Sequence, residues 1–122
     1  MLQERRDMVR ARQRAEVTYA VLPGGAPQRG VTFDLSAGGI GLVTGRVLEL
    51  WTQVQVSLAL PDRGAPVPFI GQVVWSQARE TADRTRRART VWTALRISEI
   101  APRDQDALAD FIGKMVTGTN FQ

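Results

Sequence analysis

The sequence contains no cysteine and no histidine, and each absence excludes a class of chemistry. Without cysteine the chain has no disulfide, no thiolate nucleophile and no cysteine-based metal site, a composition that suits a reducing cytoplasm. Without histidine, the commonest general base and metal ligand is missing. The carboxylates form no paired arrangement with a nucleophile or a base. We therefore expect a protein that is not an enzyme and uses no cofactor.

Long apolar runs are also absent. No stretch reaches the roughly 18 apolar residues that a membrane-spanning helix needs, and the polar N-terminus lacks the apolar segment of a signal peptide. We expect no direct membrane insertion and a cytoplasmic location, either as a free protein or as the cytoplasmic domain of a membrane protein. With 122 residues, 43% of them hydrophobic, the chain is long enough for one core and thus one domain.

Lysine is nearly absent as well. Lys114 is the single lysine, so 15 of the 16 basic residues are arginines, and the net charge is +4. A planar guanidinium matches phosphate oxygens and the guanine O6/N7 edge with two hydrogen bonds. Codon bias in a GC-rich genome explains much of the excess, so the positions of the arginines, rather than their number, indicate function.

Alternating apolar and polar residues predict several short strands and hence an all-β sandwich or barrel. The expected strands cover residues 15–21, 31–35, 40–43, 54–60, 69–75 and 91–97. Turns are expected at Pro23–Pro27 and Pro61–Gly64, because glycine and proline interrupt strand pairing. The polar segment Ala78–Arg89 is expected to be a long solvated hairpin loop.

The two ends of the chain differ from this pattern. Residues 1–14 are charged and show no apolar stripe, which predicts a flexible arginine-rich arm. Residues 101–118 are expected to form an amphipathic helix that begins near Pro102 and is capped by Gly118. Its apolar stripe has helical spacing and consists of Leu108, Phe111, Ile112 and Met115.

Two short motifs stand in a fixed order. The first is Arg6-x-x-x-Arg10, preceded by Arg5, and the second is Asp34-x-Ser36-x-x-Gly39. Arginine forks suit phosphate and guanine, a carboxylate accepts from the guanine N1–H and N2–H₂ groups, and glycine lets the backbone approach a ligand. We expect Gly39 to need a positive φ.

Together these motifs resemble the signature of the PilZ domain family, bacterial receptors for cyclic di-GMP. The resemblance covers residues 5 to 115, and the segment Gly71–Trp75 is similar to the family's penultimate strand. Ala94–Ile97 departs from the family's Gly-Val-x-Phe pattern, which concerns packing more than ligand binding. The resemblance implies a six-stranded antiparallel β-barrel over residues 15–100. It implies that the ligand-binding residues are Arg5, Arg6, Arg10, Asp34, Ser36, Gly38 and Gly39.

The resemblance also implies how the domain works. Cyclic di-GMP would order the arm against the Asp34–Gly39 turn and so signal to an attached or partner protein, such as a cellulose synthase-type glycosyltransferase or a motility protein. An arginine directly before the first motif, here Arg5, goes with two bound ligands per chain. No DNA partner is implied.

Each feature also has a plain structural interpretation. The arm would be a solvated basic segment, and Asp34 and Ser36 would stabilise an ordinary β-turn. Trp75 and Trp92 could stack on guanine, although tryptophans in strands more often lie in the core. A different functional class also stays open, because a small basic β-barrel can bind single-stranded nucleic acid.

Overall fold

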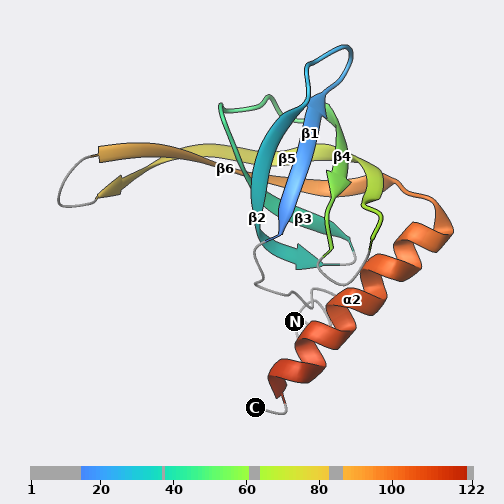
Figure 1. The fold of residues 1–122 in the computed structure, drawn as a ribbon. Coiled ribbons are helices and arrows are strands. Elements are labelled where there is room, and N and C mark those ends of the chain that lie inside the picture. The colour runs from blue at the N-terminus through green and yellow to red at the C-terminus, as the bar shows by residue number, and fades with distance from the viewer. Residues whose placement is uncertain (1–14, 37, 61–63, 83–86, 121–122) are drawn as a thin grey trace, which may run out of the picture.

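The computed structural model describes residues 15–36, 38–60, 64–82 and 87–120. Within them, six antiparallel strands close into a barrel in the order β1-β2-β3-β6-β5-β4, and one helix follows (Figure 1). The expected fold class, a six-stranded barrel with a C-terminal helix, is confirmed. The elements are β1 (Glu16–Val21), β2 (Gln28–Ser36), β3 (Gly39–Thr44), β4 (Gln53–Leu58), β5 (Val67–Ala82), β6 (Arg87–Glu99) and α2 (Pro102–Asn120).

The barrel interior holds the apolar residues of the alternating pattern. On β4, Val54, Val56 and Leu58 are fully buried, while the intervening Gln53 and Gln55 are exposed. Alternate side chains of a strand point to opposite faces, so a single run of residues both fills the core and solvates the surface. Each fully buried valine or leucine contributes roughly 1.5–3 kcal/mol through the area that it removes from water.

Helix α2 lies along one end of the barrel (Figure 1). Pro102 is its first residue, and the Ala101 carbonyl accepts hydrogen bonds from the amides of Asp104 and Gln105. Proline fits the first helical turn because its missing N–H has no intrahelical partner there. Three residues of the predicted stripe, namely Leu108, Phe111 and Ile112, are buried in the barrel's core cluster. No helix among the described residues combines the length and apolar character needed to cross a membrane.

The predicted cap at Gly118 is wrong. The helix continues through this glycine to Asn120. A glycine inside a helix costs only about 1 kcal/mol relative to alanine, so it does not by itself end the hydrogen-bonded ladder. Lys114 is exposed and pairs with Asp110 one turn earlier, with 3.3 Å between Nζ and Oδ2.

The expected solvated loop at Ala78–Arg89 is also wrong in extent. β5 continues to Ala82 and β6 starts at Arg87, and the two pair to the end with Arg79 opposite Thr90. The pair leaves the barrel as a two-stranded ribbon (Figure 1). Strand pairing is made by backbone groups and needs no buried face, so a polar sequence without alternation does not exclude it. The apolar pattern located only the part of the hairpin that packs in the barrel.

A chain of hydroxyl groups from the buried Thr44 and Thr93 and the half-buried Ser76 fixes the loop between β3 and β4. The Leu48 amide donates to Ser76 Oγ at 3.0 Å, and Thr44 Oγ1 donates to the Arg46 carbonyl at 2.9 Å. Thr93 Oγ1 lies between them, 2.8 Å from Ser76 Oγ and 2.9 Å from Thr44 Oγ1. The amide at one end and the carbonyl at the other set the direction of donation: Ser76 donates to Thr93, and Thr93 donates to Thr44. The loop is therefore held to β3, β5 and β6 at once.

Candidate functional site

A β-bulge in β2 turns the Asp34 motif outward. The pairing with β3 shifts between Thr32 and Asp34, so Phe33 is the extra residue. As a result Thr32 and Leu35, three positions apart, are both buried in the barrel. Phe33 and Asp34 are half-buried and lie on the outer face. Bulges re-aim side chains in this way and are frequent beside functional sites.

A second bulge, in β5, brings an aromatic ring to the same face. The pairing with β6 shifts between Val73 and Trp75. Val73 is fully buried, whereas Val74 is exposed and Trp75 is half-buried. The extra residue thus places two consecutive apolar side chains on the outside of the barrel. The two bulges lie on strands that flank β3 and β6, so their outward residues face a common surface.

That surface carries a hollow of about 450 Å³, which we call the motif hollow. Its lining consists of Phe33, Asp34, Ser36, Gly38, Gly39, Ile40, Gly41, Val74, Trp75, Ala94, Leu95 and Arg96. This volume lies within the range of small-molecule sites, and apolar walls with a few polar groups are typical of them. The hollow unites residues from β2, β3, β5 and β6.

The Ser36 hydroxyl stabilises the turn that ends the hollow. Ser36 Oγ accepts from the Gly39 amide at 3.2 Å and is 3.1 Å from the Gly39 carbonyl, to which it donates. The Gly38 carbonyl accepts from the Ile97 amide at 2.9 Å, which ties the turn to β6. The turn interpretation of Ser36 is thus realised, and these hydrogen bonds tie Gly38 and Gly39 to the strands beside the hollow.

The expected reason for Gly39 is wrong. Among the described glycines, Gly24 has a positive φ of 78° and Gly39 does not. Instead, a Cβ on Gly39 would overlap the carbonyl oxygen of Leu95 on the paired strand β6. Glycine is needed here because two backbones come close together.

Gly41 also lines the motif hollow and was not identified from the sequence. An added Cβ there would overlap the ring of Phe33 and come within 2.9 Å of Asp34 Oδ1. The ring and the carboxylate therefore lie directly across this glycine. Phe33 also packs on Trp92, with 4.5 Å between ring centroids and 52° between ring planes.

Trp75 and Trp92 are not core residues, contrary to the more common placement of tryptophan in strands. Both are half-buried on the outer face. The Arg79 guanidinium carbon lies 5.3 Å from each ring centroid, within cation–π distance. The bulge at Val74 sets Trp75 outside, and such a bulge has no clear sequence signature.

The predicted site residues divide into two groups. Asp34, Ser36, Gly38 and Gly39 line the same hollow. Arg5, Arg6 and Arg10 lie outside the described residues. Trp75, which the sequence offered as a stacking group, also lines the hollow. Arg96 is a further lining residue that the sequence did not indicate. Within the described residues, no three Asp or Glu side chains come together as a metal site would need.

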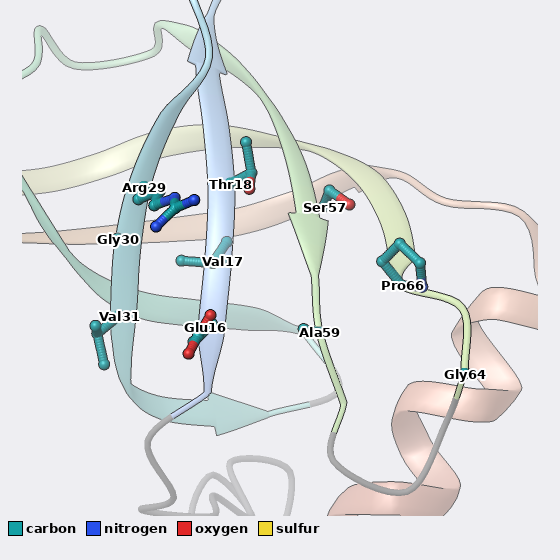
Figure 2. A pocket seen from close by; sticks show the side chains of 10 residues that line it. All are labelled: Glu16, Val17, Thr18, Arg29, Gly30, Val31, Ser57, Ala59, Gly64 and Pro66. Carbon is teal, nitrogen blue, oxygen red and sulfur yellow. The ribbon is translucent and has the colours of Figure 1, made fainter.

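A larger hollow of about 650 Å³ lies elsewhere, over β1, β2 and β4 (Figure 2). β1 is three strands from β6 in the closed ring, so this hollow faces away from the motif hollow. Glu16 and Arg29 supply its charges, and its wall has no aromatic ring (Figure 2). A binding site needs convergent groups as well as volume, so the motif hollow is the better candidate.

Comparisons with known proteins identify the family of the chain. The family model "PilZ domain" matches residues 4–114, which include both motifs. A search of curated proteins found no match.

Solved structures resemble the chain in fold. The "PilZ domain with c-di-GMP of YcgR from Escherichia coli" is 18% identical, with a TM-score of 0.73 and 94% of each chain covered. The Bacillus subtilis inhibitor of motility MotI/DgrA is 22% identical, with a TM-score of 0.69; 97% of this chain matches 52% of that one. The PilZ domain of CeSA from a cellulose-synthesizing bacterium is 18% identical, with a TM-score of 0.53 and coverage of 91% and 97%. The chain thus spans about half of MotI/DgrA but nearly all of the isolated PilZ domains.

Proposed function

The chain belongs to the PilZ domain family, and on this premise we propose that it is a receptor for cyclic di-GMP that binds its ligand in the motif hollow. The observation that supports this best is that Asp34, Ser36, Gly38 and Gly39 of the second motif line one hollow together with Trp75. A hollow with a carboxylate and aromatic walls suits a flat base that carries N–H donors, as guanine does.

The ligand's chemistry fits the carboxylate and the aromatic ring of the hollow. Cyclic di-GMP has two guanines and two phosphodiesters. The Asp34 carboxylate accepts from the guanine N1–H and N2–H₂ groups. The ring of Trp75 offers a face for stacking, which is worth about 1–3 kcal/mol per base in proteins that bind single strands.

The arm supplies the positive charge in this proposal. Arg5, Arg6 and Arg10 lie within the residues that the family model matches. Their guanidinium groups bind the phosphodiesters and the outer guanine edges bidentately. The bound ligand holds the arm against the Asp34–Gly39 turn, and this ordering is the signal that an attached or partner protein senses.

The output is exerted by another polypeptide. Solved relatives in fold include an inhibitor of motility and a domain of CeSA. We propose that this domain likewise acts in the cytoplasm on a parent or partner protein, such as a glycosyltransferase or part of the motility machinery. Arg5, directly before the first motif, sets two ligands per chain.

One observation favours a second candidate, the binding of single-stranded nucleic acid. Phe33, Trp92 and Trp75 gather on the outer face near Arg79, and exposed aromatic and basic groups are what such proteins use. Arg79 lies over the rings of Trp75 and Trp92, and this contact bears equally on both candidates, since each stacks a base on a tryptophan.

The deciding experiment is a pair of titrations at physiological salt, one with cyclic di-GMP and one with a labelled single-stranded oligonucleotide. We expect saturable binding of cyclic di-GMP and only weak, salt-sensitive binding of the oligonucleotide. Tight oligonucleotide binding without cyclic di-GMP binding would reverse the assignment.

A further inference from the structure

Arg96 is the one arginine among the described residues that line the motif hollow. It lies on β6 directly opposite Gly39 of β3 and opposite Gln72 of β5. Its neighbour Leu95 is buried in the barrel, so strand alternation puts the exposed Arg96 side chain on the outer face. Arg96 therefore lies on the outer face, on the strand that pairs with the turn of the second motif.

A neutral amide holds this guanidinium in place. Gln72 Nε2 donates to the Trp51 carbonyl at 3.3 Å, which directs Gln72 Oε1 towards Arg96. Arg96 Nη2 donates to that oxygen at 2.7 Å. No carboxylate pairs with Arg96 among the residues that the structure describes. Because its partner is uncharged, the guanidinium is oriented while its charge remains available for an anion.

The hollow is polar at the end where Arg96 lies. Along the β3–β6 pairing, Arg96 faces Gly39, whereas Ala94 faces Gly41 and lies beside Trp75. The aromatic end therefore suits a base, and the Arg96 end adjoins the glycine turn. A Cβ on Gly38 would meet nothing within 4 Å, so this end is open to a bulky group. Arginine and open backbone together suit a phosphate.

We propose that Arg96 is a further ligand-binding residue, which contacts a phosphodiester of the cyclic dinucleotide while a base lies along the Trp75 wall. This inference rests on the proposed function. It adds to the arm a guanidinium that belongs to the barrel itself and that Gln72 orients before the ligand arrives. The barrel then has its own phosphate contact, independent of the arm.

The test compares Arg96→Gln with Arg29→Gln in calorimetric titrations with cyclic di-GMP. Arg29 is the matched control, since it is also an exposed strand arginine but lines the hollow over β1, β2 and β4 (Figure 2). We expect Arg96→Gln to weaken binding roughly tenfold or more, the usual effect of losing a hydrogen bond to a charged group. Arg29→Gln should bind like the wild type.

Repeating the titrations at low and high salt identifies the group that Arg96 contacts. An ionic contact to a phosphodiester makes affinity salt-dependent, so Arg96→Gln should show a weaker salt dependence than the wild type. A loss of affinity with an unchanged salt dependence would overturn the phosphodiester assignment, because the contact would then be to a neutral guanine edge.

Two further variants separate binding from structure. Gln72→Ala removes the partner of Arg96 but keeps its charge, and should weaken binding much less than Arg96→Gln. Arg96→Lys keeps the charge but loses the planar guanidinium, so its affinity for cyclic di-GMP should lie between those of Gln72→Ala and Arg96→Gln. This variant provides the test if Arg96→Gln folds poorly. If the wild type binds cyclic di-GMP and Arg96→Gln binds equally well, the inference is wrong and the proposed function stands. If the wild type does not bind, both fall.

Discussion

At the scale of single residues, Gly38 and Gly39 differ although they are adjacent in one motif. A Cβ on Gly39 would overlap the Leu95 carbonyl, whereas a Cβ on Gly38 would meet nothing within 4 Å. A side chain at Gly39 would therefore disturb the packing of the barrel, whereas a side chain at Gly38 would enter only the space open to a ligand. Substitutions at the two positions separate these effects.

We expect Gly39→Val to destabilise the barrel by about 1–3 kcal/mol, the typical effect of forcing atoms into a packed site. Gly38→Ala should leave stability within about 0.5 kcal/mol of the wild type, as open surface sites usually do. Urea denaturation of the two variants measures both effects. Equal free energies of unfolding in the two variants would mean that β3 and β6 can move apart at Gly39 without destabilising the barrel.

We expect the selectivity for guanine to depend on Asp34. Cyclic di-AMP lacks the N1–H and N2–H₂ donors that a carboxylate accepts, so Asp34→Ala should weaken cyclic di-GMP binding more than cyclic di-AMP binding. Competition titrations with both ligands measure the ratio. If the variant instead unfolds without a separate binding defect, Asp34 serves only the turn.

At the scale of elements, the β3–β4 loop depends on the hydroxyl chain through β5 and β6. Thr93 is fully buried at its centre and bonds to both Thr44 and Ser76. A loop with few apolar anchors needs such polar fixation, because its backbone groups must be satisfied. The loop also carries Trp51, whose carbonyl orients Gln72.

Thr93→Val keeps the shape of the side chain but removes the central hydroxyl. We expect a loss of about 1–3 kcal/mol in the free energy of unfolding, because Ser76 loses its acceptor and Thr44 its donor in a buried place. The exposed Thr18→Val on β1 is the control and should change stability little. Wild-type stability in Thr93→Val would show that the fold does not need the chain of hydroxyl groups.

The arm is the second element with a testable role. Arg6→Ala and Arg10→Ala should each weaken cyclic di-GMP binding by about 2 kcal/mol or more, since each removes a charged contact to the ligand. Arg14→Ala is the control and should matter less, because Arg14 lies outside Arg6-x-x-x-Arg10 and directly before the expected first strand. Thermal unfolding without ligand should be unchanged in all three. Wild-type affinity in both of the first two variants would contradict the motif assignment.

At the scale of the whole molecule, we expect the number of bound ligands to depend on the total positive charge of the site. Two cyclic di-GMP molecules bring four phosphodiester charges to one site, and neighbouring like charges repel unless cations offset them. Arg5 adds a third guanidinium to those of Arg6 and Arg10 in the arm, and we infer a fourth at Arg96 on the barrel.

We expect calorimetry to give two cyclic di-GMP molecules per wild-type chain and a ratio nearer one for Arg5→Ala, with appreciable affinity retained. Fewer cations leave the second ligand's charge unmatched. A wild-type ratio near one, or a ratio that stays at two in the variant, would show that Arg5 does not set the stoichiometry.

The sequence by itself determined the strand pattern, the helix and the second motif. Alternation at Val54, Val56 and Leu58 identifies a strand because burial selects every second residue. The spacing of Leu108, Phe111 and Ile112 identifies the helix for the same reason at a different period. These features are local, so nearest neighbours in the chain are enough to reveal them.

Only the tertiary structure decided which residues meet in the motif hollow. The bulges at Phe33 and Val74 turn side chains outward, and each depends on pairing with a strand distant in sequence. Gly41 and Arg96 enter the hollow because β3 lies beside β6, a neighbour that chain order does not give. The polar ribbon beyond the barrel was missed for a related reason: its backbone pairing leaves no periodic trace in the side chains.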